Sequence, residues 1–454
     1  MIPMQKIELL SPAGTIRNLR YAIAYGADAV YAGMPRYSLR VRNNDFLGEN
    51  LASGIAETHA AGKRFFLACN LVPHGAKLKT FMADLEPIVE MGPDALIMAD
   101  PGLIMWARER WPEMPIHLSV QANTVNAAAV EFWRRVGVTR VILSRELSLD
   151  EVAEIRQQCP EMELEVFVHG ALCIAYSGRC LLSGYFNHRD ANQGSCTNSC
   201  RWEYKVSQTN QGRHPLADQE YMLEEKQRPD QLMPIFEDEM GTYIMNSKDL
   251  RAIEHVHRLV EIGIDSLKIE GRTKSHYYAA RATQAYRWAI DDALAGRPFR
   301  PQLMGELDGL ANRGYTDGFY QRHETKEMQN YRSNSSENSA EIFVGELLDE
   351  QAEAGFVWVD VKNRFAVGDE LRLITPSGNH DFVLQAMTDD KGRVLDLAPG
   401  SGYRVQIPLP ADVDYSDYSL LTRLLSGEQR AEREVASTSV VFEHAISGGV
   451  TPAC

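Results

Sequence analysis

Short apolar runs and amphipathic segments alternate along the first 170 residues of the chain. The apolar runs include IELLSPA (7–13), DAVYAG (28–33) and DALIMAD (94–100), and amphipathic segments such as NAAAVEFWRRVG (126–137) lie between them. This alternation is typical of parallel βαβ units. Seven strands in series, with no glycine-rich phosphate loop, favour a (β/α)8-type barrel over a doubly wound sheet.

The alternation stops over residues 171–240, a long excursion that holds most of the cysteines. Loops of this length are uncommon unless they have a function. The pattern resumes with TYIMNSKDL (242–250), the strand DSLKIEG (265–271) and a long helix from His276 to Ala295. Nine strands are then predicted, one more than a regular barrel needs. Residues 1–300 are therefore expected to form an α/β, TIM-like barrel with one extra strand and a cysteine-rich insertion.

The last third of the chain has a different pattern. A loosely patterned linker is predicted over residues 301–340, and residues 341–425 contain six short apolar runs separated by turns. Strands at that spacing predict a small antiparallel β-barrel. Residues 426–454 show no periodicity and are predicted to form a mobile tail.

Composition and charge restrict the classes of protein that fit. The chain has 454 residues and no apolar run of about 18 residues, so no transmembrane helix is predicted. The N-terminus lacks the apolar core of a signal peptide, which favours a cytoplasmic protein with reduced thiols. The net charge of −15, from 47 Lys and Arg against 62 Asp and Glu, counts against a nucleic-acid partner, although a local basic face would be enough to bind one.

Four of the seven cysteines lie in one glycine-rich stretch, HGALCIAYSGRCLLSGYFNHRDANQGSCTNSC (169–200), and are Cys173, Cys180, Cys196 and Cys200. A disulfide knot is disfavoured in a reducing compartment. Structural zinc sites usually contain paired C-x₂₋₄-C knuckles, and only Cys196 and Cys200 have that spacing. An iron–sulfur cluster suits the irregular spacing at least as well. The stretch is therefore predicted to bind a metal, with both kinds of site left open.

Polar residues follow successive predicted strands, where a barrel of this type places its active site. They are Ser11, Asn70, Gln121, Asn123, Arg145, Glu146, His169, Asn246, Asp249, Lys268, Glu270 and Arg272. Glu146 and Glu270 are candidate acid–base groups, although pairing with the neighbouring arginines would serve structure equally well. His169 directly precedes the cysteines and is a candidate for proton transfer or for support of a metal site.

A third candidate group is PRYSLRVRNNDF (35–46), which follows the second predicted strand. Its arginines, Arg36, Arg40 and Arg42, could bind carboxylates or phosphates through their planar guanidinium groups, or could form a solvated basic loop. The sequence contains neither a GxSxG elbow nor an HExxH helix. No hydrolase motif therefore supports a hydrolytic function directly.

The segment EVFVHGALCIAYSGRCLLSG (165–184) resembles the signature of the collagenase-like peptidase family, whose catalytic type is unassigned. The motifs ELLSPAG, VYAG, LSVQAN, NSKDL and LKIEGR fit the same family in the same order, so the resemblance covers nearly the whole chain. The stretches YSLRVRNN, CTNSCRWEY and RGYTDGF are most similar to the tRNA-hydroxylation branch of this family.

The resemblance implies an oxidoreductase that acts on tRNA. Members of this branch are linked to hydroxylation of wobble uridine to 5-hydroxyuridine, and they depend on prephenate and on the iron–sulfur assembly machinery without requiring molecular oxygen. Carried over to this chain, the ligands of a 4Fe–4S cluster would be Cys173, Cys180, Cys196 and Cys200. Cationic candidates for the two carboxylates of prephenate, by charge and position, are Arg145, Arg272 and the group Arg36, Arg40 and Arg42. Gln121, Asn123 and Lys268 complete the expected substrate-binding set.

Two other functions stay open on the sequence. The name of the family records a collagenase-like peptidase, which would need an activated nucleophile or a metal-bound water. A zinc site closed by four cysteines would leave no position for such a water. The third reading is a non-catalytic scaffold in which the metal loop is purely structural.

Overall fold

The computed structural model describes residues 7–38, 45–171, 248–321 and 341–426, apart from single loop positions. Between residues 172 and 247 it describes only the backbone of six short strands. Part of the predicted linker and nearly all of the predicted mobile tail lie outside the described residues, as do Arg40 and Arg42. None of the described helices is long and apolar enough to cross a membrane.

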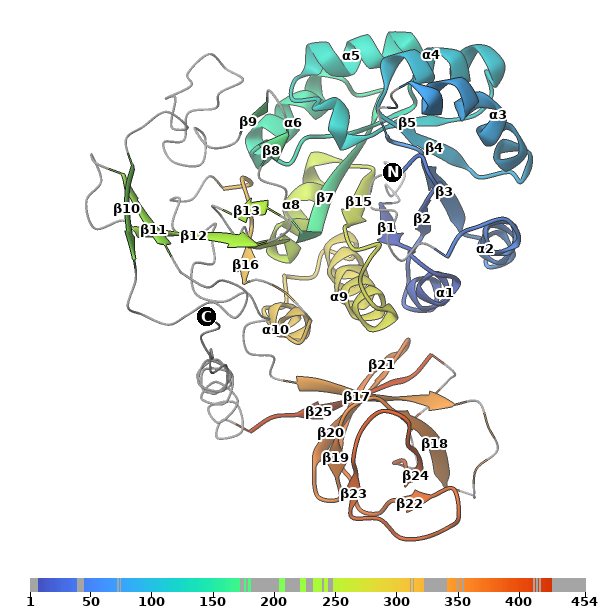
Figure 1. The fold of residues 1–454 in the computed structure, drawn as a ribbon, viewed down its shortest axis with the longest axis vertical. Helices are drawn as coiled ribbons and strands as arrows, with labels where there is room; N and C mark the ends of the chain where they lie inside the picture. Colours follow the sequence, from blue (N-terminus) through green and yellow to red (C-terminus); the bar gives the residue numbers. More distant parts are fainter. Residues whose placement is uncertain are drawn as a thin grey trace, which may run out of the picture.

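Eight parallel strands close into a barrel (Figure 1). Their hydrogen-bonded order is β15-β1-β2-β3-β4-β5-β6-β7, and the pairing of β15 with β7 closes the ring. The strands are β1 (Glu8–Pro12), β2 (Ala29–Gly33), β3 (Arg64–Ala68), β4 (Ala95–Met98), β5 (Ile116–Leu118), β6 (Arg140–Ile142), β7 (Glu163–Ala171) and β15 (Ser266–Ile269). The barrel predicted from the alternating pattern is confirmed.

The ninth predicted strand lies outside this ring. Within TYIMNSKDL, β14 (Asp249–Arg251) pairs antiparallel with the carboxyl end of β7, with Asp249 opposite Ala171. The short strand β16 (Tyr315–Thr316) then pairs with β14. The chain therefore leaves the barrel at the end of β7 and returns hydrogen-bonded to the same strand.

Helices surround the barrel, and their starts carry the capping residues that end the strand pattern. Asp100 caps α4 (Pro101–Arg110) with proline at the first helical position, and Ser148 with Glu151 forms a capping box on α6 (Leu149–Gln158). The other helices of the barrel are α1 (Ile16–Ala24), α2 (Glu49–Ala60), α3 (Ala76–Glu90), α5 (Ala127–Val136), α8 (Val256–Ile262), α9 (His276–Leu294) and α10 (Gln302–Asp308). Their apolar faces and the strands form one core.

A network of charged side chains occupies the amino-terminal half of the barrel interior. Arg140 is 1% exposed, and its Nη1 lies 2.5 Å from Glu8 Oε1 and 3.1 Å from Glu165 Oε2. Lys268 Nζ lies 2.8 Å from Glu165 Oε1. Burial by itself raises the pKa of Glu165, but Lys268 and Arg140 hold that pKa below its usual value. The buried charge pairs at this end fit the stabilising role of the amino-terminal face of such barrels.

The carboxyl-terminal part of the chain forms a strongly curved antiparallel sheet (Figure 1). Its order is β21-β20-β25-β17-β18-β24-β22. Two further strands from the same part of the sequence, β19 (Phe365–Ala366) and β23 (Leu397–Ala398), form a separate pair. The strands of the sheet are β17 (Glu341–Leu348), β18 (Phe356–Val361), β20 (Glu370–Thr375), β21 (Gly378–Val383), β22 (Thr388–Asp389), β24 (Arg404–Pro408) and β25 (Leu420–Leu424). The inward residues form their own core. The antiparallel β structure of the predicted small barrel is confirmed, and among the described residues the strand order runs from β21 to β22 without a pairing that closes it.

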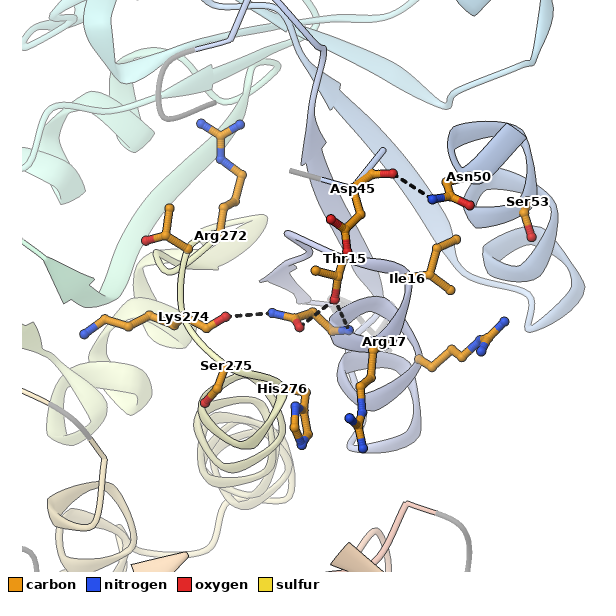
Figure 2. Close-up of a pocket in the computed structure, with 13 residues that line it drawn as sticks. Thr15, Ile16, Arg17, Asp45, Asn50, Ser53, Arg272, Lys274, Ser275 and His276 are labelled. Atoms are coloured by element: carbon orange, nitrogen blue, oxygen red, sulfur yellow. Dashed lines mark hydrogen bonds between the residues drawn. The ribbon is translucent and has the colours of Figure 1, made fainter. Parts of the chain in front are cut away.

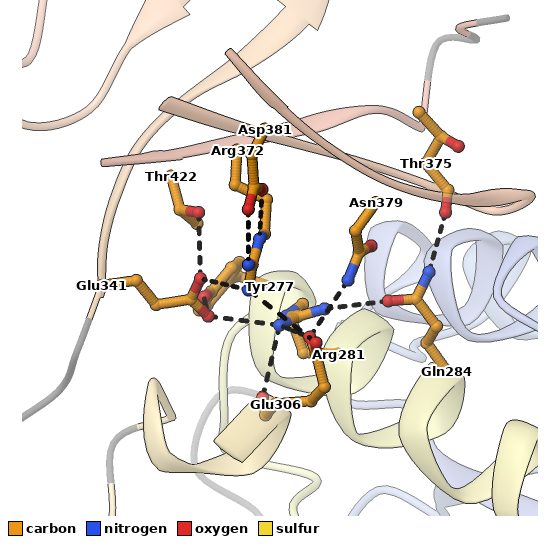
Figure 3. Close-up of polar contacts among 10 residues, drawn as sticks. All are labelled: Tyr277, Arg281, Gln284, Glu306, Glu341, Arg372, Thr375, Asn379, Asp381 and Thr422. Atoms are coloured by element: carbon orange, nitrogen blue, oxygen red, sulfur yellow. Dashed lines mark hydrogen bonds and ion pairs between the residues drawn. The ribbon is translucent and has the colours of Figure 1, made fainter. Parts of the chain in front are cut away.

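Helix α9 joins the two cores through buried polar contacts (Figure 3). Arg281 is fully buried and forms ion pairs with Glu306 of α10 and with Glu341, the first residue of β17. Glu341 also accepts hydrogen bonds from Tyr277 and from Thr422 of β25. The barrel and the carboxyl-terminal sheet therefore share one desolvated ion-pair network.

Candidate functional site

Amide and hydroxyl side chains line the carboxyl ends of strands β3, β5 and β6. Asn70 Nδ2 donates to Ser119 Oγ at 3.3 Å, and that hydroxyl donates to Gln121 Oε1 at 2.9 Å. A second set centres on Ser144, whose hydroxyl lies 3.3 Å from Asn123 Oδ1 and 3.2 Å from Glu146 Oε2. The expected residues Gln121, Asn123 and Glu146 therefore gather at one end of the barrel.

Arg145 connects three strand ends at the point where the cysteine stretch leaves the barrel. Its Nη1 donates to the carbonyl of Ala171 at 2.6 Å, and its Nη2 lies 3.3 Å from Glu270 Oε2. The guanidinium carbon lies 3.8 Å from the centre of the Phe167 ring, a cation–π contact. The structure thus brings the predicted residues Arg145 and Glu270 together as an ion pair that is only partly exposed.

Lys268 and Arg272 come from the same strand and the loop after it but lie at different depths. Lys268 is 3% exposed and lies 4.3 Å from the centre of the Tyr31 ring, bound to Glu165 below it. The guanidinium carbon of Arg272 lies 5.8 Å from the centre of the same ring, and a Cβ atom at Gly33 would collide with its guanidinium group. Arg272 is therefore at the barrel mouth, whereas Lys268 belongs to the interior network.

His169 points toward helix α9. A register shift in the β7–β15 ladder pairs Lys268 with Phe167 but Ile269 with His169, so one residue of β7 is bulged. The imidazole packs among the rings of Tyr278, Tyr286 and Tyr315 at 5.5–5.7 Å. Burial, aided by Arg251 and Lys274, lowers the pKa of His169 to about 3. Its Nε2 has no hydrogen-bond partner among the described residues.

Acidification should destabilise the protein through His169. Because the folded state holds this imidazole neutral, with a pKa near 3 against about 6.5 when unfolded, its contribution is complete above pH 6.5 and is lost as the pH falls toward 3. At pH 4.5 the loss is about 2–3 kcal/mol. The free energy of unfolding should be measured with urea at pH 7 and at pH 4.5, on samples of equal metal content. The difference between the two pH values should be smaller in His169→Phe than in the wild type. An equal difference in both proteins would show that His169 is not the sensitive group.

Arg36 has its partners on helix α3 of the barrel. It adopts a left-handed backbone conformation, with φ of 69°, and its Nη1 lies 3.2 Å from Asp84 Oδ2. The Tyr37 hydroxyl donates to the same carboxylate, and the Arg36 side chain is about half exposed. Arg40 and Arg42 lie outside the described residues. The structure therefore shows Arg36 in a surface ion pair and leaves the rest of the group as a prediction.

The cysteine ligand set stays a prediction. Cys173, Cys196 and Cys200 lie outside the described residues, and only the backbone of Cys180 is described, as the last residue of β9 (Arg179–Cys180) opposite β8 (Ala175–Tyr176). The part of the chain whose side chains are described contains no group of three metal-ligating residues. Four thiolates are a donor set that suits either an iron–sulfur cluster or zinc, so the chemistry of this stretch fits the expected metal.

A cavity of about 710 Å³ lies beside the barrel mouth, between the β1–α1 and β15–α9 loops (Figure 2). Of the residues that line it, only Arg272 is among the candidates predicted from the sequence. The signals that mark it are the helix starts GTIRN and TKSHY, where Thr15 and Ser275 cap α1 and α9. The residues that line the cavity are Thr15, Ile16, Arg17, Asn18, Arg20, Asp45, Asn50, Ser53, Arg272, Thr273, Lys274, Ser275 and His276.

Comparisons with known proteins agree with this architecture. Residues 14–330 match the model of peptidase family U32, and residues 340–421 match the model of the U32 C-terminal domain. The tRNA hydroxylation protein P of Escherichia coli K12 is 59% identical over 447 residues, which are 94% of this chain and 98% of that protein. The Haemophilus influenzae protein of the same name is 54% identical over 445 residues, 92% of this chain and 96% of that protein.

A more distant relative has a different name. A Porphyromonas gingivalis protein called Collagenase is 27% identical over 427 residues, 90% of this chain and 96% of that protein. The family matches cover both domains and confirm the resemblance seen in the sequence motifs. The chain belongs to peptidase family U32.

Proposed function

We propose that this chain hydroxylates the wobble uridine of tRNA to 5-hydroxyuridine. The observation that carries the proposal is the 59% identity to the tRNA hydroxylation protein of Escherichia coli, which extends over 98% of that protein. A likeness of that extent includes the barrel, the cysteine stretch and the carboxyl-terminal domain together. The polar mouth formed by β3, β5, β6 and the β15–α9 loop is the place where a nucleoside would react.

The four cysteines of residues 173–200 would hold a 4Fe–4S cluster. When bound, such a cluster supplies electron transfer or polarises an oxygen donor. The stretch begins directly after Ala171, whose carbonyl accepts from Arg145, so it starts at the barrel mouth. Arg145 would fix this starting point and place a positive charge beside it.

Prephenate, the proposed co-substrate, carries two carboxylates that need cationic partners. Arg145 and Arg272 lie at the ends of β6 and β15, and planar guanidinium groups bind carboxylates through two parallel hydrogen bonds. The amides of Gln121 and Asn123, which follow β5, would orient the uridine or the co-substrate. Glu270, held by Arg145, and Glu146, held near Ser144, are the proposed acid–base groups.

The tRNA of a strain that lacks the gene provides the decisive comparison. Mass spectrometry should show loss of 5-hydroxyuridine derivatives in a strain without a second pathway, with recovery from a plasmid carrying the wild-type gene. Cys173→Ala and Cys196→Ala should fail to restore the modification and should lose iron, sulfide and visible absorption after anaerobic purification. Cys159→Ala is the matched control, because that thiol is buried outside the stretch. Unchanged 5-hydroxyuridine in the deletion strain would overturn the proposal.

The peptidase function has the distant relative named Collagenase in its favour. The same purified protein can be incubated with gelatin. Digestion that survives replacement of Cys173 and Cys196 would support a peptidase. A colourless protein with tightly bound zinc and no effect on tRNA would instead support a structural metal loop.

A further inference from the structure

The cavity in Figure 2 is formed by the loops that follow two neighbouring strands, β1 and β15. Asn18 of α1 donates from its side-chain amide to the carbonyl of Lys274 at 2.9 Å, which ties one loop to the other. Asn18 is itself fixed by Thr15, whose hydroxyl donates to its side-chain oxygen at 2.8 Å. The two walls of the cavity are therefore held together by hydrogen bonds of the protein itself.

The lining carries an excess of positive charge. The lining contains one carboxylate, that of Asp45, and four cationic side chains, which are Arg17, Arg20, Arg272 and Lys274. Arg20 is held by a two-pronged ion pair with Glu57, at 2.7 and 2.9 Å, and Arg17 by Glu346. Both of these carboxylates stand outside the lining. They neutralise much of the charge of these two arginines, so the excess positive charge of the lining comes from Arg272 and Lys274 against Asp45.

The uncharged part of the lining has the composition of a phosphate contact. Hydroxyl groups come from Thr15, Ser53 and Ser275, and an amide comes from Asn50. The Ser53 hydroxyl now donates to Glu57 and the Asn50 amide to the carbonyl of Asp45, so a phosphate would take the place of these partners. Arginine, lysine, serine, threonine, asparagine and helix N-termini are the groups that proteins present to the phosphates and sugars of nucleic acids. Helices α1 and α9 both begin here, so their positive ends add to the same preference for an anion.

Arg272 joins the cavity to the barrel mouth. Its guanidinium group packs beside Gly33 and Tyr31 of β2, and the residue is one of those that line the cavity. An RNA strand with one nucleotide in the barrel mouth would therefore place the neighbouring phosphate in the cavity. The chain as a whole has a net charge of −15, so a local basic surface of this kind is what RNA binding would require.

From these contacts we infer that the cavity between the β1–α1 and β15–α9 loops binds a backbone phosphate of the RNA that places its uridine in the barrel mouth. The inference rests on the proposed function, because it assigns a subsite to the same substrate. The phosphate contact positions the strand and carries no sequence information. Specificity for the nucleotide would come from the mouth.

Binding of a fluorescent tRNA anticodon stem-loop tests the inference without any hydroxylation. Lys274→Gln removes one cation of the lining, and Ser53→Glu adds a carboxylate on the half-exposed face of α2. Each should raise the Kd about threefold to tenfold, and Lys274→Gln should reduce the slope of log K against log salt by about 0.7, as for one lost phosphate contact. Lys63→Gln is the charge-matched control, since Lys63 pairs with Asp28 and does not line the cavity.

Titration calorimetry with prephenate separates the two anionic ligands. Prephenate affinity should be unchanged in Lys274→Gln and Ser53→Glu. Unchanged RNA binding in both variants would overturn the inference, and a loss of prephenate affinity with intact RNA binding would assign the cavity to the dicarboxylate instead. The deletion strain tests the proposed function separately, because RNA can bind to the cavity whether or not it is hydroxylated.

Discussion

Replacement of Arg140 by methionine should lower the free energy of unfolding by about 3–5 kcal/mol. The guanidinium group is 1% exposed and is the shared partner of Glu8 and Glu165 in the barrel interior. Removing it takes one cation from each of two buried carboxylates, so that Glu8 is left with Arg64 and Glu165 with Lys268. A buried carboxylate that loses part of its pairing costs far more than a lost surface ion pair. Urea or thermal unfolding followed by circular dichroism would measure the change.

Two further variants make the cause specific. Arg134→Met removes an arginine that pairs with Glu131 on the surface of α5, and it should leave the unfolding midpoint unchanged. The double variant Glu8→Gln, Arg140→Met should lose less stability than the two single changes added together, because it no longer contains one of the carboxylates that Arg140 pairs with. Strict additivity of the two changes would show that the loss comes from packing against Phe66, which Arg140 also covers.

Arg281→Met should loosen the attachment of the carboxyl-terminal sheet, with a loss of about 3–5 kcal/mol. Arg281 connects Glu306 of α10 with Glu341 of β17 in a buried network (Figure 3). Without it, Glu341 keeps hydrogen bonds from Tyr277 and Thr422, and its nearest cation is Arg372 at 3.9 Å. Hydrogen exchange of the β17 amides should become faster, while the β3 amides inside the barrel should keep their protection.

The control for this variant is on the same helix. Arg287→Met removes an arginine of α9 that pairs with Asp28 and Asp291 on the barrel side. It should leave exchange of the β17 amides unchanged. Equal protection of β17 in Arg281→Met and the wild type would mean that the other contacts between the domains are enough, such as Tyr277 stacked on Phe343 and the hydrogen bond from Gln284 to the carbonyl of Thr375.

The alternation of apolar runs was enough to predict the barrel, because parallel strands buried on both faces give continuous apolar segments. It also predicted a surplus strand but not which one. The surplus segment contains β14, and its antiparallel pairing with β7 depends on where the chain returns in space. Local sequence pattern does not encode that return.

The sequence predicted which residues lie near the candidate site better than it predicted how deeply each is buried. Arg145, Glu270, Gln121 and Asn123 do follow barrel strands and do meet at the mouth. Lys268 follows the same rule in sequence, yet its partner Glu165 holds it in the interior. The ring of His169 packs against the tyrosines of α9 beside a bulge in β7. Its expected role near the metal site stays a prediction, because the cysteine side chains lie outside the described residues. Burial depth and bulges arise from pairing between distant strands, which no single segment reveals.

The pairing of β14 with β7 has a consequence for how such a barrel could have acquired its cysteine stretch. Ala171 and Asp249 face each other across one antiparallel ladder, so the chain leaves and re-enters at a single point. Any length of polypeptide between them is accommodated without a change in the path of the strands on either side. The barrel can therefore gain, lose or exchange the segment between these two residues as a unit, in the way that a hairpin tolerates a new loop. Proteins that catalyse different reactions could then evolve on one barrel by replacing this inserted segment alone.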